Sequence, residues 1–66
     1  MIGRLIKSVR IQRKLSQQKL GELCGYKGGS ARVMVQKWEK EIAPIPLDKI
    51  RPLARALGLT VDEFVP

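Results

Sequence analysis

Apolar residues recur at helical spacing along most of the chain. In the first segment they stand at positions i, i+3, i+4 and i+7 with polar residues between them, which is the stripe of an amphipathic helix. We therefore predict a first helix over residues 2–13. The apolar members of this stripe are Ile2, Leu5, Ile6 and Val9.

A second, shorter helix is predicted over residues 17–24. Ser16 stands directly before it and is a good N-cap, because its side-chain oxygen can accept a hydrogen bond from a free backbone N–H. Gly25 follows the last apolar residue of the segment and ends the helix, as a C-terminal glycine commonly does.

A turn and a third helix follow. Residues 26–30 contain two adjacent glycines, so the default interpretation is a flexible turn. Ser30 is the next cap candidate, and the third helix is predicted over residues 31–40. Within it, Val35 and Trp38 stand three residues apart and are expected to face inward. We interpret Trp38 as a core anchor rather than a base-stacking platform.

The fourth helix begins after a break at residues 43–46. This segment is not helical, because each of its two prolines biases the preceding residue toward extended backbone. Helical spacing then returns, and Gly58 closes the helix. Pro52 is tolerated best in a first turn, where some N–H groups lack partners anyway. We therefore expect this helix to start between residues 49 and 51, or to open irregularly.

The last element is a single turn. Thr60 and Glu63 have the spacing of a capping box, in which the two residues satisfy each other's backbone N–H groups. No repeat, low-complexity segment or linker interrupts the sequence. The pattern therefore predicts five short helices that form one all-α domain over residues 1–66.

Positive charge is concentrated in the first part of the chain. The formal net charge is +7, yet residues 1–40 hold ten basic and two acidic side chains, whereas residues 41–66 hold three basic and four acidic ones. This asymmetry is typical of a polyanion-binding face that is backed by a packing or partner-binding region.

The composition argues against several other classes of protein. The chain has no histidine and one cysteine, Cys24, so we expect no internal disulfide, no metal site, no cofactor and no enzyme active site. We interpret Cys24 as a small buried residue. No run of about 18 apolar residues is present, and the N-terminal residues are too densely charged for a signal peptide. The expected location is the cytoplasm, in association with the nucleoid.

The helices over residues 17–24 and 31–40 follow each other across a glycine-containing turn. The second one is rich in side chains that can reach DNA. A helix fits the major groove, where arginine and lysine can pair with guanine and glutamine with adenine. The side chains of this kind are Arg32, Gln36, Lys37 and Lys40.

Several short motifs lie in a fixed order over nearly the whole chain. They are Ser16-Gln17-Gln18-x-Leu20-Gly21-x-Leu23-x-Gly25, Val35-x-x-Trp38-Glu39, Pro46-Leu47, Leu53-Ala54-x-x-Leu57-Gly58-Leu59 and Asp62-Glu63-Phe64. Together they resemble the phage repressor and Cro helix-turn-helix family, the xenobiotic-response-element-like (XRE) group. The resemblance implies a compact five-helix bundle of the lambda-repressor type, which binds a short palindromic operator in double-stranded DNA as a homodimer and acts as a transcriptional repressor.

The resemblance also implies roles for individual residues. The exposed recognition-helix positions that read bases are Arg32, Val33, Gln36 and Lys37; for Val33 the alternative is packing against a neighbouring helix. Gln17, at the start of the second helix, and Ser16 beside it are expected to contact phosphate. Lys40, just past the third helix, is expected to contact phosphate as well. Arg10 and Glu39 match a pair that forms a partly buried salt bridge in some members.

The turn at residues 25–30 departs from the family pattern, because it is longer than in typical members. Lys27 in this turn is expected to add a phosphate contact, together with the neighbouring glycine amides. The departure bears on where the third helix starts, so the match of Lys37 to the family is safer than that of Arg32.

The apolar C-terminal residues are expected to complete the core and to form a dimer patch. Symmetric association would set two recognition helices about one DNA turn, or ~34 Å, apart. The residues concerned are Leu59, Val61, Phe64 and Val65.

Two alternatives to a repressor remain open. One is an antitoxin or another protein-partner-binding helix-turn-helix module that also regulates its own promoter. The other is binding of nucleic acid through charge alone, without sequence preference.

Overall fold

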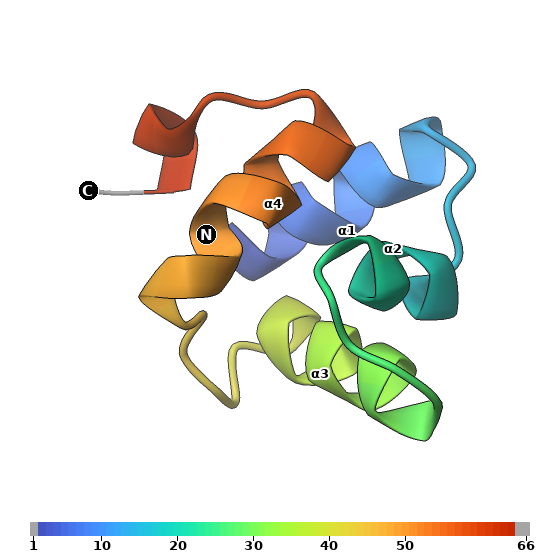
Figure 1. Ribbon diagram of the computed structural model, residues 1–66. Coiled ribbons are helices and arrows are strands. Elements are labelled where there is room, and N and C mark those ends of the chain that lie inside the picture. Colours follow the sequence, from blue (N-terminus) through green and yellow to red (C-terminus); the bar gives the residue numbers. More distant parts are fainter. Residues whose placement is uncertain (1, 65–66) are drawn as a thin grey trace.

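Four α-helices and one short 3₁₀ helix make up the computed structural model, which describes residues 2–64 (Figure 1). No strand occurs within this range, so the all-α class is confirmed. The fifth element expected from the sequence is a 3₁₀ turn rather than an α-helix. The elements are α1 (Ile2–Gln12), α2 (Gln17–Leu23), α3 (Gly29–Glu39), α4 (Leu47–Leu57) and η1 (Val61–Phe64).

One apolar core joins the four α-helices. Trp38 is only 1% exposed, which confirms its expected role as a core anchor, and Val35 beside it is fully buried. Burying a large apolar side chain contributes about 1.5–3 kcal/mol, so these few residues supply much of the stability of so short a chain. The largest fully buried side chains are Trp38, Ile6, Leu20, Leu53, Leu57 and Val35.

The boundaries of α1 and α2 lie within one residue of those predicted. Ser16 is the N-cap of α2, as expected, and its Oγ accepts a hydrogen bond of 2.9 Å from the backbone N–H of Lys19. Gly25 follows α2 with a φ of 100°, a conformation that glycine adopts without strain. The side chain of Ser16 and the backbone of Gly25 therefore define the two ends of this short helix.

The predicted start of the third helix is wrong. α3 begins at Gly29, and its N-cap is Gly28, so Ser30 lies inside the first turn and caps nothing. Gly28 has φ 61° and ψ −150°, a conformation that is essentially confined to glycine. Because this glycine already turns the chain into the helix, and its carbonyl accepts from the N–H of Ala31 at 3.2 Å, a serine cap is not needed.

The predicted start of the fourth helix is also wrong. α4 begins at Leu47, directly after Pro46, and the N–H of Lys49 donates to the carbonyl of Pro46 at 2.9 Å. Pro52 therefore lies inside the helix, where it has no N–H to donate to the carbonyl of Asp48. Asp48 is exposed, so water can reach this turn, and the strongly apolar inner face of α4 compensates for one missing hydrogen bond.

Glycine allows two close helix crossings. A Cβ atom at Gly21 would overlap the backbone of Ala31, so α2 and α3 pack directly against each other at this point. A Cβ atom at Gly3 would stand 2.8 Å from the carbonyl oxygen of Trp38, which brings α1 equally close to α3. These two contacts fix α3 against the rest of the molecule.

The capping box after α4 is formed only in half. The N–H of Thr60 donates to Oε2 of Glu63 at 2.9 Å, as the motif requires. The N–H of Glu63, however, donates to the backbone carbonyl of Thr60 at 3.1 Å, because η1 is a 3₁₀ turn in which such i to i+3 bonds are formed.

Candidate nucleic-acid interface

The outer face of α3 carries basic and apolar side chains that are open to solvent. Arg32, Val33 and Lys37 are exposed, with Val33 at 39% of its surface. Lys40, the C-cap residue of α3, is exposed as well. The buried residues of the same helix, including Trp38, lie on its opposite face, so this outer face is available to a partner.

Gln36 differs from these neighbours because it is half-buried and hydrogen-bonded within the protein. Its Nε2 donates to Oε1 of Gln17, the first residue of α2, at 3.3 Å. Gln17 in turn donates from Nε2 to Oε1 of Glu39 at 3.1 Å. A chain of hydrogen bonds therefore runs from the outer face of α3 to the start of α2 and back to the end of α3.

The same carboxylate forms an ion pair with α1. Arg10 Nε lies 2.6 Å from Oε2 of Glu39, and the two side chains are only 11% and 5% exposed. Arg10 also donates from Nη1 to the carbonyl of Leu15 at 2.9 Å, which holds its guanidinium in place. This ion pair joins the first and third helices, as the family resemblance led us to expect.

The carboxylate of Glu39 determines how both amides of the network are oriented. An ionised carboxylate only accepts hydrogen bonds, so the nitrogen of Gln17 must face Glu39 and its oxygen must face Gln36. Gln36 must then turn its own nitrogen toward Gln17. The oxygen of Gln36 and its second N–H remain for an external partner.

A side chain near the start of α2 also holds the connection between α2 and α3 in place. Gln18 Nε2 donates to the carbonyl oxygen of Gly28 at 2.9 Å and to Oε2 of Glu22 at 3.0 Å. Lys27, one residue before Gly28, is exposed. Gln18 was not among the functional residues expected from the sequence, although its i, i+4 spacing to Glu22 is a recognisable signal of a side-chain pair on a helix.

Tyr26 fixes the other end of this turn. Its ring lies 5.8 Å from that of Trp38 at an angle of 58°, and Lys49 Nζ stands 4.8 Å from the centre of the tyrosine ring. Burial raises the pKa of Tyr26 above its ordinary value; the negative charge of Asp48 acts in the same direction, as does that of the Cys24 thiolate once it forms at alkaline pH. The tyrosine is therefore a neutral anchor at neutral pH.

Cys24 has the buried position that the sequence led us to expect. It is 3% exposed, and burial raises the pKa of its thiol to about 11, an effect that the charge of Lys49 partly opposes. The thiol is therefore protonated at neutral pH and is a poor nucleophile. Within residues 2–64, no group of three or more potential ligand residues could hold a metal ion.

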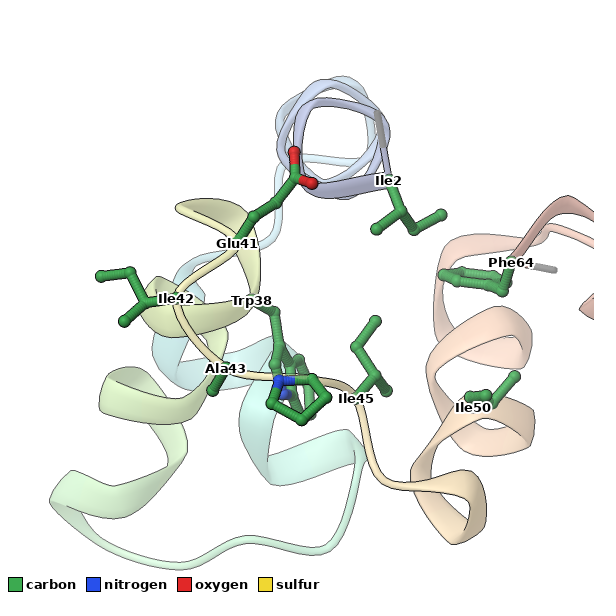
Figure 2. A pocket seen from close by; sticks show the side chains of 9 residues that line it. Ile2, Trp38, Glu41, Ile42, Ala43, Ile45, Ile50 and Phe64 are labelled. Atoms are coloured by element: carbon green, nitrogen blue, oxygen red, sulfur yellow. The ribbon is translucent and has the colours of Figure 1, made fainter. Parts of the chain in front are cut away.

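A hollow of about 380 Å³ opens where α1, the loop before α4 and η1 meet. Figure 2 shows Ile2 and Phe64 pointing toward one another across it, with Ile45 and Trp38 on its wall. The Nε1 of Trp38 is buried and has no hydrogen-bond partner among the described residues. The residues that line the hollow are apolar except for Glu41, so the hollow is mainly apolar.

The residues expected to form a dimer patch have different surroundings. Leu59 is half-buried and packs against the core, whereas Val61 is 41% exposed. Phe64 lines the hollow described above, and Val65 lies outside the described residues. Among the described members of this group, Val61 is therefore the side chain most open to a partner.

The comparison with protein families gives a match to a family model described as "Helix-turn-helix", over residues 6–64. The match covers more than half of the chain and includes the whole of α2, the turn and α3. The chain belongs to the helix-turn-helix family. The resemblance of its motifs to the XRE group is thereby confirmed. Searches of curated proteins and of solved structures gave no match to the chain.

Helix-turn-helix proteins of this type are DNA-binding regulators and are generally not enzymes. The matched residues include α2 and α3, and α3 carries the exposed face described above. No helix within residues 2–64 is both long and apolar enough to cross a membrane.

Proposed function

We propose that this protein is a sequence-specific regulator of transcription that inserts α3 into the major groove of double-stranded DNA. The observation that carries the proposal is the exposed face of α3, where Arg32, Val33 and Lys37 stand on a helix held rigidly by its inner face. A helix fits the major groove, and each base pair presents a distinct pattern of donors and acceptors there.

Each exposed side chain of α3 suits a particular base contact. The guanidinium of Arg32 and the ammonium of Lys37 can donate to O6 and N7 of guanine, and the methyl groups of Val33 can contact the methyl group of thymine. Gln36 retains one acceptor and one N–H after bonding to Gln17, which is the complement of the N6 and N7 edge of adenine.

Phosphate contacts would surround this reading face. Ser16 uses the oxygen of its hydroxyl to cap α2, which leaves the hydroxyl hydrogen free to donate. Gln17 retains one N–H after donating to Glu39. Lys27 and Lys40 are exposed and supply positive charge before and after α3. Such contacts fix the position of a protein on DNA without reading the sequence.

We further propose that two copies bind a roughly palindromic operator and act as a Cro-like repressor in the cytoplasm. Val61 is the exposed apolar residue of the C-terminal end, and Phe64 borders the apolar hollow beside it. Contact between two such ends would give a symmetric dimer, whose recognition helices must lie about 34 Å apart to enter successive turns of one DNA face.

Binding of another protein, as in an antitoxin, is the second candidate function. It is favoured by exposed apolar side chains near the hollow, since Ile42 is 69% and Leu47 87% exposed. Single exposed apolar residues are common on soluble proteins, so this observation is weaker than the reading face of α3. The two functions are compatible in one molecule.

Alanine substitutions on α3 test the assignment of roles. Arg32→Ala or Lys37→Ala should relax the preference at one base pair by about 1–3 kcal/mol, whereas Lys40→Ala should weaken binding to all sequences alike. Equal losses on every duplex from all three substitutions would contradict base reading by α3 and would favour binding through charge alone.

A further inference from the structure

The turn between α2 and α3 is tied to the protein at both of its ends. At one end, Tyr26 packs beside Trp38 and lies under the ammonium group of Lys49. At the other end, the carbonyl of Gly28 accepts a hydrogen bond of 2.9 Å from Gln18. Lys27 stands between the two ties and is exposed.

The hydrogen bond from Gln18 is itself oriented by a second one. Gln18 Nε2 donates one hydrogen to Glu22 and the other to Gly28. Because the carboxylate of Glu22 can only accept, it keeps the nitrogen of Gln18 turned toward the carbonyl of Gly28. The backbone of Gly28, with φ 61° and ψ −150°, then sets the direction in which the chain enters α3.

Lys49 reaches the turn from α4. Its Nζ lies over the ring of Tyr26, and a Cβ atom at Gly25 would stand 3.4 Å from the same nitrogen, so the ammonium lies against the start of the turn. The side chain of Lys49 is 23% exposed. The side chain of Lys49 therefore mainly contacts other residues of the protein rather than solvent.

We propose that Gln18 and Lys49 are positioning residues for DNA binding, which hold the α2–α3 turn so that Lys27 meets a phosphate of the bound duplex. This inference rests on the proposed function. A glycine-containing turn would otherwise lose conformational freedom when it bound DNA, and that loss would weaken the complex. Because the contacts of Gln18 and Lys49 already order the turn before binding, much of this entropy loss is avoided when DNA binds.

A double-mutant cycle tests the proposal. Binding to a fluorescently labelled duplex of mixed sequence is measured by anisotropy at several salt concentrations for the wild type, Gln18→Ala, Lys27→Ala and the double variant. Lys27→Ala should weaken binding and lower the slope of log K against log salt by about 0.9, the value for one phosphate contact. Gln18→Ala should weaken binding by about three- to tenfold in the wild type. In the Lys27→Ala background, it should have less than about a twofold effect.

Controls separate this effect from unfolding. Gln12→Ala removes an exposed glutamine of α1, away from the turn, and should leave the affinity unchanged. Lys49→Met removes the ammonium over Tyr26 and so releases the other end of the turn. If Gln18→Ala fails to fold, Lys49→Met takes its place in the double-mutant cycle. Its loss of affinity should likewise disappear in the Lys27→Ala background.

The outcomes distinguish this inference from the proposed function. If the losses from Gln18→Ala and Lys27→Ala simply add, or if Lys27→Ala leaves binding unchanged, the positioning role is wrong while DNA binding stands. If the wild type binds no duplex even at low salt, the proposed function fails and the inference fails with it.

Discussion

Arg10 in α1 and Glu39 at the end of α3 are joined by an Nε to Oε2 contact of 2.6 Å in a nearly buried setting. The carboxylate of Glu39 also accepts from Gln17 at the start of α2. The side chain of Glu39 therefore connects α1, α2 and α3. Its carboxylate sets the orientation of the Gln17 amide, which also bonds to Gln36 beside the exposed face of α3.

Removing either charge of this pair should destabilise the protein strongly. Glu39→Ala leaves the guanidinium of Arg10 nearly buried without its partner, so the free energy of unfolding should fall by about 3–5 kcal/mol. Arg10→Met should have a similar effect. Urea unfolding followed by the fluorescence of Trp38 measures both changes.

The matched control for the ion pair is the double variant Arg10→Met with Glu39→Leu. It replaces both charges by apolar groups, so it should be more stable than either single variant. If Glu39→Ala costs less than about 1 kcal/mol, the pair behaves as a solvent-exposed ion pair, and its structural role is contradicted.

The two adjacent glycines at the start of α3, the N-cap Gly28 and the first helical residue Gly29, should respond in opposite ways to alanine. No atom lies within 4 Å of a Cβ atom added at either position, so neither new methyl group would clash with a neighbouring residue. Gly28→Ala should destabilise the protein by about 1–3 kcal/mol because its backbone conformation is confined to glycine. Gly29→Ala should stabilise it by about 0.5–1 kcal/mol because alanine favours helix.

Thermal unfolding of these two variants side by side measures the difference. Equal midpoints for Gly28→Ala and Gly29→Ala would mean that the turn does not adopt the described conformation in solution.

The thiol of Cys24 should make stability depend on alkaline pH. Burial raises its pKa from the ordinary value of 9.0 to about 11 in the folded state, so the folded protein holds this proton more tightly than the unfolded chain. The resulting contribution to stability is complete below pH 9 and is lost as the pH rises through about 11. Denaturant unfolding between these two values measures the loss.

Cys24→Ala is the control for this titration, because lysine and tyrosine side chains also titrate in the same range. The wild type should lose more stability than Cys24→Ala over the interval. Parallel pH profiles would show that the thiol is not buried as described.

Sequence periodicity was sufficient to predict the α1 and α2 helices and the inward position of Trp38. It failed at the starts of α3 and α4, for physical reasons that differ. At α3, a glycine conformation replaced the side-chain cap that Ser30 would have supplied. At α4, the burial of one helix face outweighed the hydrogen bond that Pro52 removes, which a rule about single residues does not weigh.

Part of the candidate site depended on contacts between distant residues. The pair of Arg10 and Glu39 was expected from family resemblance, but the bonds from Gln18 to Gly28 and from Gln17 to Gln36 depend on how α2 crosses α3. Gly21 permits that crossing, and its closeness to Ala31 is invisible in the sequence. The sequence therefore indicates which residues are candidates for the site, but it does not indicate how they are oriented relative to one another.

The proposed dimer contact can be tested at Val61. Val61→Lys places a charge on the exposed C-terminal end without removing positive charge, so it should abolish dimers on the operator and weaken operator binding more than about tenfold. Sedimentation of the protein–DNA complex gives its stoichiometry. Ile11→Lys, at an exposed apolar residue of α1, is the control and should leave both properties unchanged.

The proposed dimer would be contradicted if the wild type sedimented as one protein chain per operator. It would also be contradicted if Val61→Lys bound the operator with the same affinity and stoichiometry as the wild type.

The most direct test of the central claim is a fluorescence-anisotropy titration of the wild type against a duplex selected from randomised DNA, beside a scrambled duplex of the same length. If α3 reads base sequence, a palindromic site should emerge that binds at least about a thousandfold more tightly than the scrambled duplex at physiological salt. Failure of any sequence to emerge, with equal and weak binding to both duplexes, would contradict sequence-specific recognition by α3.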